Sequence, residues 1–111
     1  MAICKNKPAF LVESCLLTFG LVSAGEAALA ESSRAAGLAG APLCWIKDGE
    51  IAVGTMEEYL PFRASRPSGK FALDDIDAAL AGRLSGALTA SGTMEVCRRL
   101  GVRCAVSGGI G

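Results

Sequence analysis

The sequence has no histidine and few aromatic residues, with one tryptophan, one tyrosine and four phenylalanines among its 111 residues. The absence of histidine excludes His-based metal sites, Ser-His-Asp triads and Cys-His dyads. Any side chain that acts as an acid or base must therefore be Glu, Asp, Lys, Tyr or Cys.

The chain also lacks an excess of charge of either sign. Its Lys and Arg residues number 11, as do its Asp and Glu residues, so the formal net charge is zero. Because a nucleic-acid-binding surface usually shows clustered basic charge, nucleic acid is not an expected partner. No apolar run reaches the roughly 20 residues that span a bilayer, so we expect no membrane partner. Hydrophobic residues make up 51% of the chain, which favours one folded domain with a modest core.

No pair of cysteines has the CxxC spacing of many metal sites and redox motifs. The number of cysteines is odd, which disfavours both a disulfide framework and a zinc site. The five positions are Cys4, Cys15, Cys44, Cys97 and Cys104. Small apolar thiols in a reducing compartment are the favoured interpretation.

The segment Pro8–Ala30 has two incompatible interpretations. It is largely apolar, follows Lys5 and Lys7, and ends in small residues, as a secretory signal peptide does. Glu13 lies inside the apolar run, and a carboxylate there opposes insertion into a membrane. The alternative is a buried strand that delivers a carboxylate to a reaction. The pattern alone favours this alternative without excluding export.

Local patterns in the first half predict both strands and a helix. The apolar run Ala9–Val12 predicts a short buried strand, and the helix formers of residues 25–40 predict a helix of about three turns. Two apolar runs, Leu43–Ile46 and Ile51–Val53, flank an Asp-Gly pair. Asp-Gly favours a type I′ turn, so these runs predict a β-hairpin.

The second half predicts two helices and a last strand. Residues 63–69 have the composition of a mobile polar loop. A helix is expected from residue 73 until Gly86 stops it, and another in the segment 89–101. The first of these has Ile76, Ala79, Leu80 and Leu84 on one face, with Asp74 and Asp75 in its first turn. A buried strand that runs into a glycine-rich turn follows, and the resulting αβ unit predicts the α/β class.

Four features could carry chemistry, and each has a simpler explanation. Glu13 follows a strand, where open α/β sheets place functional groups, or it is a solvated strand end. Lys70 follows the loop and could meet an anion, or it is a surface lysine. In 85–94, Thr89 or Ser91 could cap a helix that approaches a phosphate, or only cap it. The glycines of 107–111 could let the backbone approach a ligand, or form a tight turn.

Taken in order, four segments resemble the pseudouridine-5′-phosphate glycosidase family, also called the indigoidine synthase A-like family. They read "PAFLVESCLLTFGL", "APLCWIKDGEIAVG", "GKFALDDIDAALAGRLSGALTASGTM" and "LGVRCAVSGGIG". The family carries an "ALESTIISHG"-like strand, a "PATIAILDGKIHVG"-like hairpin, a "KVSRRDL" segment leading to "GTTVAATM", and "GIRVFATGGIGG". The resemblance favours a first catalytic strand at the N-terminus over an export signal.

The resemblance implies a three-layer α/β/α fold, of which residues 1–111 would be the N-terminal portion, ending at the glycine-rich turn. Members of the family reversibly cleave the C–C glycosidic bond of pseudouridine 5′-phosphate to uracil and ribose 5-phosphate. They are cytosolic, typically homotrimeric, and depend on a metal, usually Mn²⁺. A lysine forms an imine with the sugar and a glutamate moves protons.

The family's site residues can be assigned here only by position. Glu13 matches the proton-donating glutamate, and Lys70 matches a lysine that contacts the substrate, where a cation suits a 5′-phosphate. Ala90 falls where the family has a substrate-contacting valine. Thr89 and Ser107 match threonine positions near the phosphate.

The sequence departs from the family pattern at several positions. Phe19 replaces the histidine of "SHG", "ALTASGT" replaces "GTTVAAT", and "FALDD" replaces "VSRRD". The chain ends before the segment that carries the metal-binding aspartate and the imine-forming lysine. Two other hypotheses therefore stay open: a non-catalytic remnant that binds sugar phosphates, and a small secreted domain.

Overall fold

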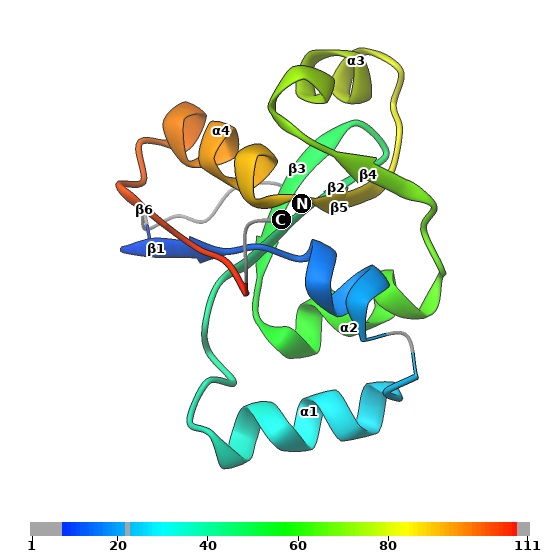
Figure 1. The fold of residues 1–111 in the computed structure, drawn as a ribbon, viewed down its shortest axis with the longest axis vertical. Coiled ribbons are helices and arrows are strands. Elements are labelled where there is room, and N and C mark those ends of the chain that lie inside the picture. The colour runs from blue at the N-terminus through cyan, green and yellow to red at the C-terminus, as the bar shows by residue number, and fades with distance from the viewer. Residues whose placement is uncertain (1–7, 22, 109–111) are drawn as a thin grey trace.

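The computed structural model describes residues 8–21 and 23–108 as a sheet with helices on both faces (Figure 1). The strands are β1 (Phe10–Val12), β2 (Leu43–Lys47), β3 (Glu50–Gly54), β4 (Gly69–Phe71), β5 (Gly86–Leu88) and β6 (Cys104–Val106). The longer helices are α1 (Glu26–Ala35), α2 (Met56–Ala64), α3 (Ile76–Ala81) and α4 (Ala90–Leu100). A π-helical turn, η1 (Leu16–Gly20), follows β1, and a 3₁₀ turn, η2 (Leu73–Asp75), precedes α3.

Alternating side chains of the central strand β2 divide the core into two parts. Cys44 and Ile46 face α3 and α4, and pack in a cluster with Val96. Leu43 and Trp45 face the opposite side, where they pack against Tyr59 and Phe62 of α2. Sheet strands buried on both faces are typical of three-layer α/β proteins. The predicted α/β/α architecture is thus confirmed, and in Figure 1 α1 and α2 lie on one side with α3 and α4 on the other.

The sheet is mixed, with strand order β4-β5-β2-β1-β6 and β3 paired to β2. β1 runs parallel to both β2 and β6, whereas β5 runs antiparallel to β2 and parallel to β4. Among the described residues, no helix is of the length and apolar character needed to cross a membrane.

The predicted hairpin is confirmed in β2 and β3. Asp48 and Gly49 both have positive φ, 51° and 77°, as a type I′ turn requires. Gly49 also lies against the turn that follows α3, where an added Cβ would be 2.7 Å from Arg83 Cα. Only glycine combines this backbone conformation with this close approach.

The helix α2 was missed by sequence reasoning. Thr55 caps it through a capping box with Glu58, since Glu58 N–H donates to Thr55 Oγ1 and the Glu58 carboxylate accepts from Thr55 N–H. Pro61 lies inside the helix and removes one backbone donor, which hides the helical signal in this segment. The predicted polar loop was also too long at both ends, because Arg63 and Ala64 belong to α2 and Gly69 begins β4.

Two further predictions about local structure were wrong. The helix expected after residue 73 ends at Ala81, so Leu84 lies outside it and is 47% exposed, and Gly86 belongs to β5 instead of stopping a helix. The strand β6 was expected to be buried, yet Cys104, Ala105 and Val106 are all exposed. Among the described strands, β6 lies at the edge of the sheet and pairs only with β1.

The predicted third helix is confirmed as α4. Thr89 Oγ1 accepts from Gly92 N–H at 3.2 Å, and Gly101 ends the helix in the left-handed conformation, with φ of 73°. In its last turns the Glu95 carboxylate accepts from Arg98 at 2.7 and 2.9 Å and from Arg99 at 2.7 Å. These hydrogen bonds lower the pKa of Glu95 from 4.5 to about 2.

This depressed pKa predicts an acid-sensitive helix. A carboxyl group with a lowered folded-state pKa stabilises the fold above its unfolded pKa of 4.5, and this stabilisation is lost as pH falls toward about 2. We expect Glu95→Gln to reduce the loss of stability between about pH 5 and about pH 3, measured from urea midpoints. The exposed Glu57→Gln is the charge-matched control. An unchanged pH profile in Glu95→Gln would contradict this account.

Candidate functional site

The register of the sheet brings the ends of β1 and β5 together. Val12, the last residue of β1, pairs with Leu43, the first residue of β2. Ala87 of β5 pairs with Trp45 along the same edge of β2, because β3 pairs along the opposite edge. β1 and β5 run in opposite directions relative to β2, so this stagger places both carboxyl ends beside the start of β2. A hydrogen bond from Leu88 N–H to Ser14 Oγ at 3.1 Å joins the two ends.

Glu13 lies at this junction and is only 7% exposed. Its backbone N–H donates to Val106 O at 2.9 Å, which extends the pairing of β1 with β6 by one bond. Its carboxylate oxygen Oε1 accepts from Ser107 Oγ at 2.9 Å and from Gly108 N–H at 3.3 Å. A buried carboxylate with two donors is held in one position.

Lys70 lies across the site on the short strand β4 and is exposed. Its Nζ is 5.7 Å from the centroid of the Phe19 ring, within the range of a cation–π contact. Phe19 is carried by the turn η1. The residue that replaces the family's histidine thus contacts the lysine that the sequence singled out.

Thr89 and Ala90 form the start of α4. Thr89 N–H donates to Phe71 O at 3.0 Å, so the end of β5 is fixed to the end of β4. The side chain of Ser91 accepts from Leu73 N–H at 3.1 Å. The N-terminus of an eleven-residue helix carries partial positive charge and unpaired N–H groups, which favour an anion.

One open cavity of about 660 Å³ joins these groups. Glu13, Lys70, Thr89 and Ala90 all line it, as do residues of η1 and Gly108. Four of the five predicted site residues therefore meet at one cavity, although they come from three separate segments of the chain. The fifth, Ser107, does not line this cavity but donates a hydrogen bond to Glu13, which does.

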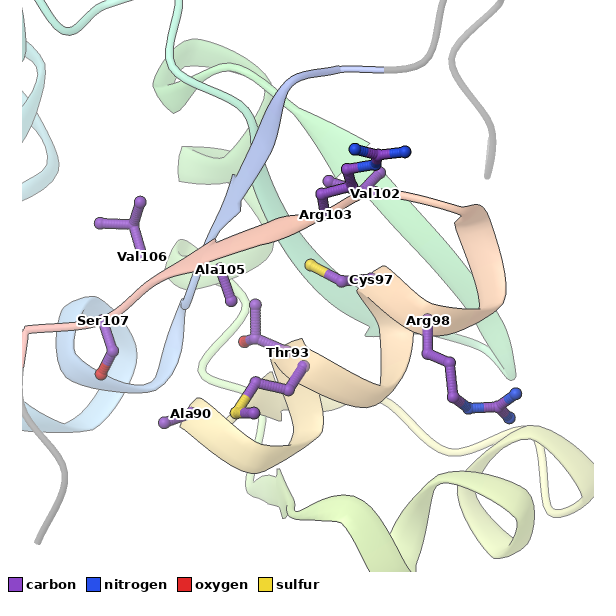
Figure 2. Close-up of a pocket in the computed structure, with 10 residues that line it drawn as sticks. Ala90, Thr93, Cys97, Arg98, Val102, Arg103, Ala105, Val106 and Ser107 are labelled. Carbon is purple, nitrogen blue, oxygen red and sulfur yellow. The ribbon is translucent and has the colours of Figure 1, made fainter.

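A second cavity, of about 320 Å³, lies between α4 and β6 (Figure 2). Ala90 and Ser107 line one end, while Arg98 and Arg103 line the other. Ala90 borders both cavities, so the start of α4 separates them.

Two residues of the site were not predicted from the sequence. Ser14 is fully buried and joins β1 to β5, as described above. Cys15 lines the cavity; burial raises the pKa of its thiol, nearby Lys70 opposes this rise and Glu13 adds to it. Both directly follow Glu13, and that adjacency was the only signal in the sequence. Among described cysteines, Cys15, Cys44, Cys97 and Cys104 are free thiols, and Cys4 lies outside the described residues.

Arg63 holds the turn that carries Phe19. The side chain is 8% exposed, so the prediction of a mobile loop at this residue was wrong. Its guanidinium donates to Leu17 O, Leu21 O and Ala24 O at 2.7–2.8 Å, and to the Glu26 carboxylate at 2.5 Å. A single side chain thereby links α2, η1 and the start of α1.

The residues of the cavity do not compose a metal site. Among the described residues no group of three His, Cys, Asp or Glu side chains could hold an ion. Mn²⁺ prefers several oxygen ligands, and Glu13 is the only carboxylate among the described residues that line the cavity. The expected manganese therefore stays a prediction from the resemblance, and no step is assigned to it here.

Comparison with known proteins identifies the family. A family model described as indigoidine synthase A like protein matches residues 1–111. This chain belongs to the indigoidine synthase A-like family. None of the curated proteins matches the chain.

Two solved structures of this kind resemble the chain. An indigoidine synthase A-like protein from Thermotoga maritima is 27% identical over 98% of this chain, with a TM-score of 0.78. The prealnumycin C-glycosynthase AlnA, solved in complex with ribulose 5-phosphate, is 32% identical over 94% of this chain, with a TM-score of 0.66. The match covers 38% and 34% of those proteins, so this chain spans little more than a third of their length.

The hydrogen bonds of Arg63 predict that its removal destabilises the fold. Arg63→Ala should lower the free energy of unfolding by about 3 kcal/mol, the low end for a broken buried ion pair, because Glu26 is partly exposed. Arg34→Ala, which breaks the exposed pair with Glu31, should cost at most about 1 kcal/mol. Urea unfolding followed by the fluorescence of Trp45 measures both. Equal effects of the two variants would show that the contacts of Arg63 are not the cause.

Proposed function

We propose that this chain supplies the proton-transfer and phosphate-binding part of an enzyme that acts on the C–C glycosidic bond of a sugar phosphate. The convergence of Glu13, Lys70 and the start of α4 on one cavity carries this proposal. The family membership supports it, as does the C-glycosynthase that binds a sugar phosphate.

The substrate we propose is pseudouridine 5′-phosphate, which is cleaved with uptake of water to uracil and ribose 5-phosphate. Cleavage of the C–C bond leaves an electron pair on the uracil carbon, and that carbon must receive a proton. Glu13 is the one carboxyl group of the described cavity lining, so it would provide this proton. In the reverse direction the same carboxylate would accept it.

Lys70 and the start of α4 would hold the phosphate. An ammonium group and the N–H groups of a helix N-terminus both stabilise a phosphate dianion. Ala90 presents a methyl group beside these N–H groups, so the backbone at this position stays open to a ligand. The cation–π contact with Phe19 would keep the ammonium group of Lys70 over the cavity.

The remaining parts of the proposal rest on the resemblance alone. They are an N-terminal portion of one larger domain over residues 1–111, Mn²⁺ as the cofactor, a homotrimer and a cytosolic location. The four motifs that resemble the family do not include its imine-forming lysine or its metal-binding aspartate. A non-catalytic protein that binds sugar phosphates is the second candidate, favoured by a cavity that contains the anion-binding groups.

The phosphate part of the proposal predicts an effect of Lys70 on binding. Calorimetric titration with ribose 5-phosphate should show that Lys70→Ala weakens binding by about tenfold or more, because a charge-assisted hydrogen bond contributes roughly 1.5–3 kcal/mol. Lys47→Ala removes the same charge at the hairpin and should leave binding unchanged. Equal binding by Lys70→Ala and the wild type would refute the assignment of Lys70.

The proton-transfer part predicts an effect of Glu13 on catalysis. In a uracil-release assay with pseudouridine 5′-phosphate and Mn²⁺, on a family-length enzyme that contains this chain, Glu13→Gln should lower the rate by about 10²–10⁴-fold, since an amide cannot donate the proton. Binding of ribose 5-phosphate should be retained. A wild-type enzyme of that length that binds ribose 5-phosphate but releases no uracil would favour the non-catalytic candidate.

A further inference from the structure

Ser107 and Glu13 are neighbours because of the pairing of β1 with β6. Val12 and Val106 are register partners, so the residue after each strand lies at the same end of the sheet. Figure 2 shows Ser107 at the end of β6, pointing to the same side as Ala105 and opposite to Val106. That side leads to Glu13, whose Oε1 lies 2.9 Å from Ser107 Oγ.

The hydroxyl group of Ser107 is poorly suited to bind a phosphate in this arrangement. A serine hydroxyl has one proton, and here that proton is donated to the Glu13 carboxylate. Phosphate oxygens are acceptors and require donors. The side chain of Ser107 also borders the cavity between α4 and β6 and not the one that contains Lys70 and Thr89.

We propose that Ser107 is a positioning residue for the carboxyl group of Glu13 and not a phosphate ligand. Ser107 Oγ and Gly108 N–H both donate to Oε1, which fixes the position and the plane of the carboxyl group. The serine-glycine turn after β6 thus serves the acid-base group. The catalytic meaning of this arrangement rests on the proposed function, whereas the contact itself does not.

A spectroscopic test examines the contact directly. The carboxyl ¹³C resonance of Glu13, assigned by its loss in Glu13→Gln, should move in Ser107→Ala, together with the amide resonance of Gly108. Ser107→Thr keeps the hydroxyl group and should restore both resonances. Ser32→Ala, on the exposed face of α1, is the matched control and should change neither. Unmoved Glu13 and Gly108 resonances in Ser107→Ala would overturn the proposal.

A binding test separates the two roles of Ser107. Ser107→Ala should leave the dissociation constant of ribose 5-phosphate within about twofold of the wild type, because the phosphate loses no ligand. A loss of about tenfold or more would make Ser107 an anion ligand and overturn the proposal. If the wild type itself does not bind ribose 5-phosphate, the proposed function fails, and the resonances of Glu13 and Gly108 alone decide the role of Ser107.

Discussion

The hydrogen bonds of Arg63 are the constraint on which the candidate site depends, because they hold the segment that carries Phe19. The segment between β1 and α1 contains a π-helical turn, a rare local structure that occurs mostly as single turns. The planar, rigid guanidinium group of Arg63 donates hydrogen bonds to three carbonyl oxygens of this segment. A lysine could not reproduce this geometry. A second bond supports the same turn, since the hydroxyl groups of Thr18 and Tyr59 lie 2.7 Å apart. The position of Phe19, whose ring contacts the ammonium group of Lys70, therefore follows from contacts made by α2.

Elements with a strong local signal could be predicted from the sequence. The β-hairpin has a turn that requires two residues with positive φ, and α4 has both a threonine cap and a terminal glycine. The strands β4 and β5 have three residues each, too few to show an alternating pattern. They are strands because they pair with each other and β5 pairs with β2, which the sequence alone does not reveal. The exposure of β6 was missed because burial of a strand depends on its neighbours and not on its own composition.

Several residues of the candidate site could be predicted from the sequence, but the contacts between them could not. Glu13, Lys70 and Thr89 were found because each belongs to a motif that resembles a family pattern, and the fold brings them to one cavity. The bond between Ser14 and Leu88 joins residues 74 positions apart, so no local pattern reports it. The same reason explains why the contact of Ser107 with Glu13 was not predicted. Its partner Glu13 lies 94 positions earlier in the chain.

The pairing of β1 has a consequence for the order in which the site can form. β1 has only one register pair with β2 but three with β6, so β6 determines which face of the sheet each side chain of β1 occupies. A shift by one residue would turn Glu13 toward the opposite layer. During synthesis β1 leaves the ribosome first and β6 almost 100 residues later. The carboxylate therefore has no defined place until β6 arrives, and the cavity can form only after β6 has paired with β1.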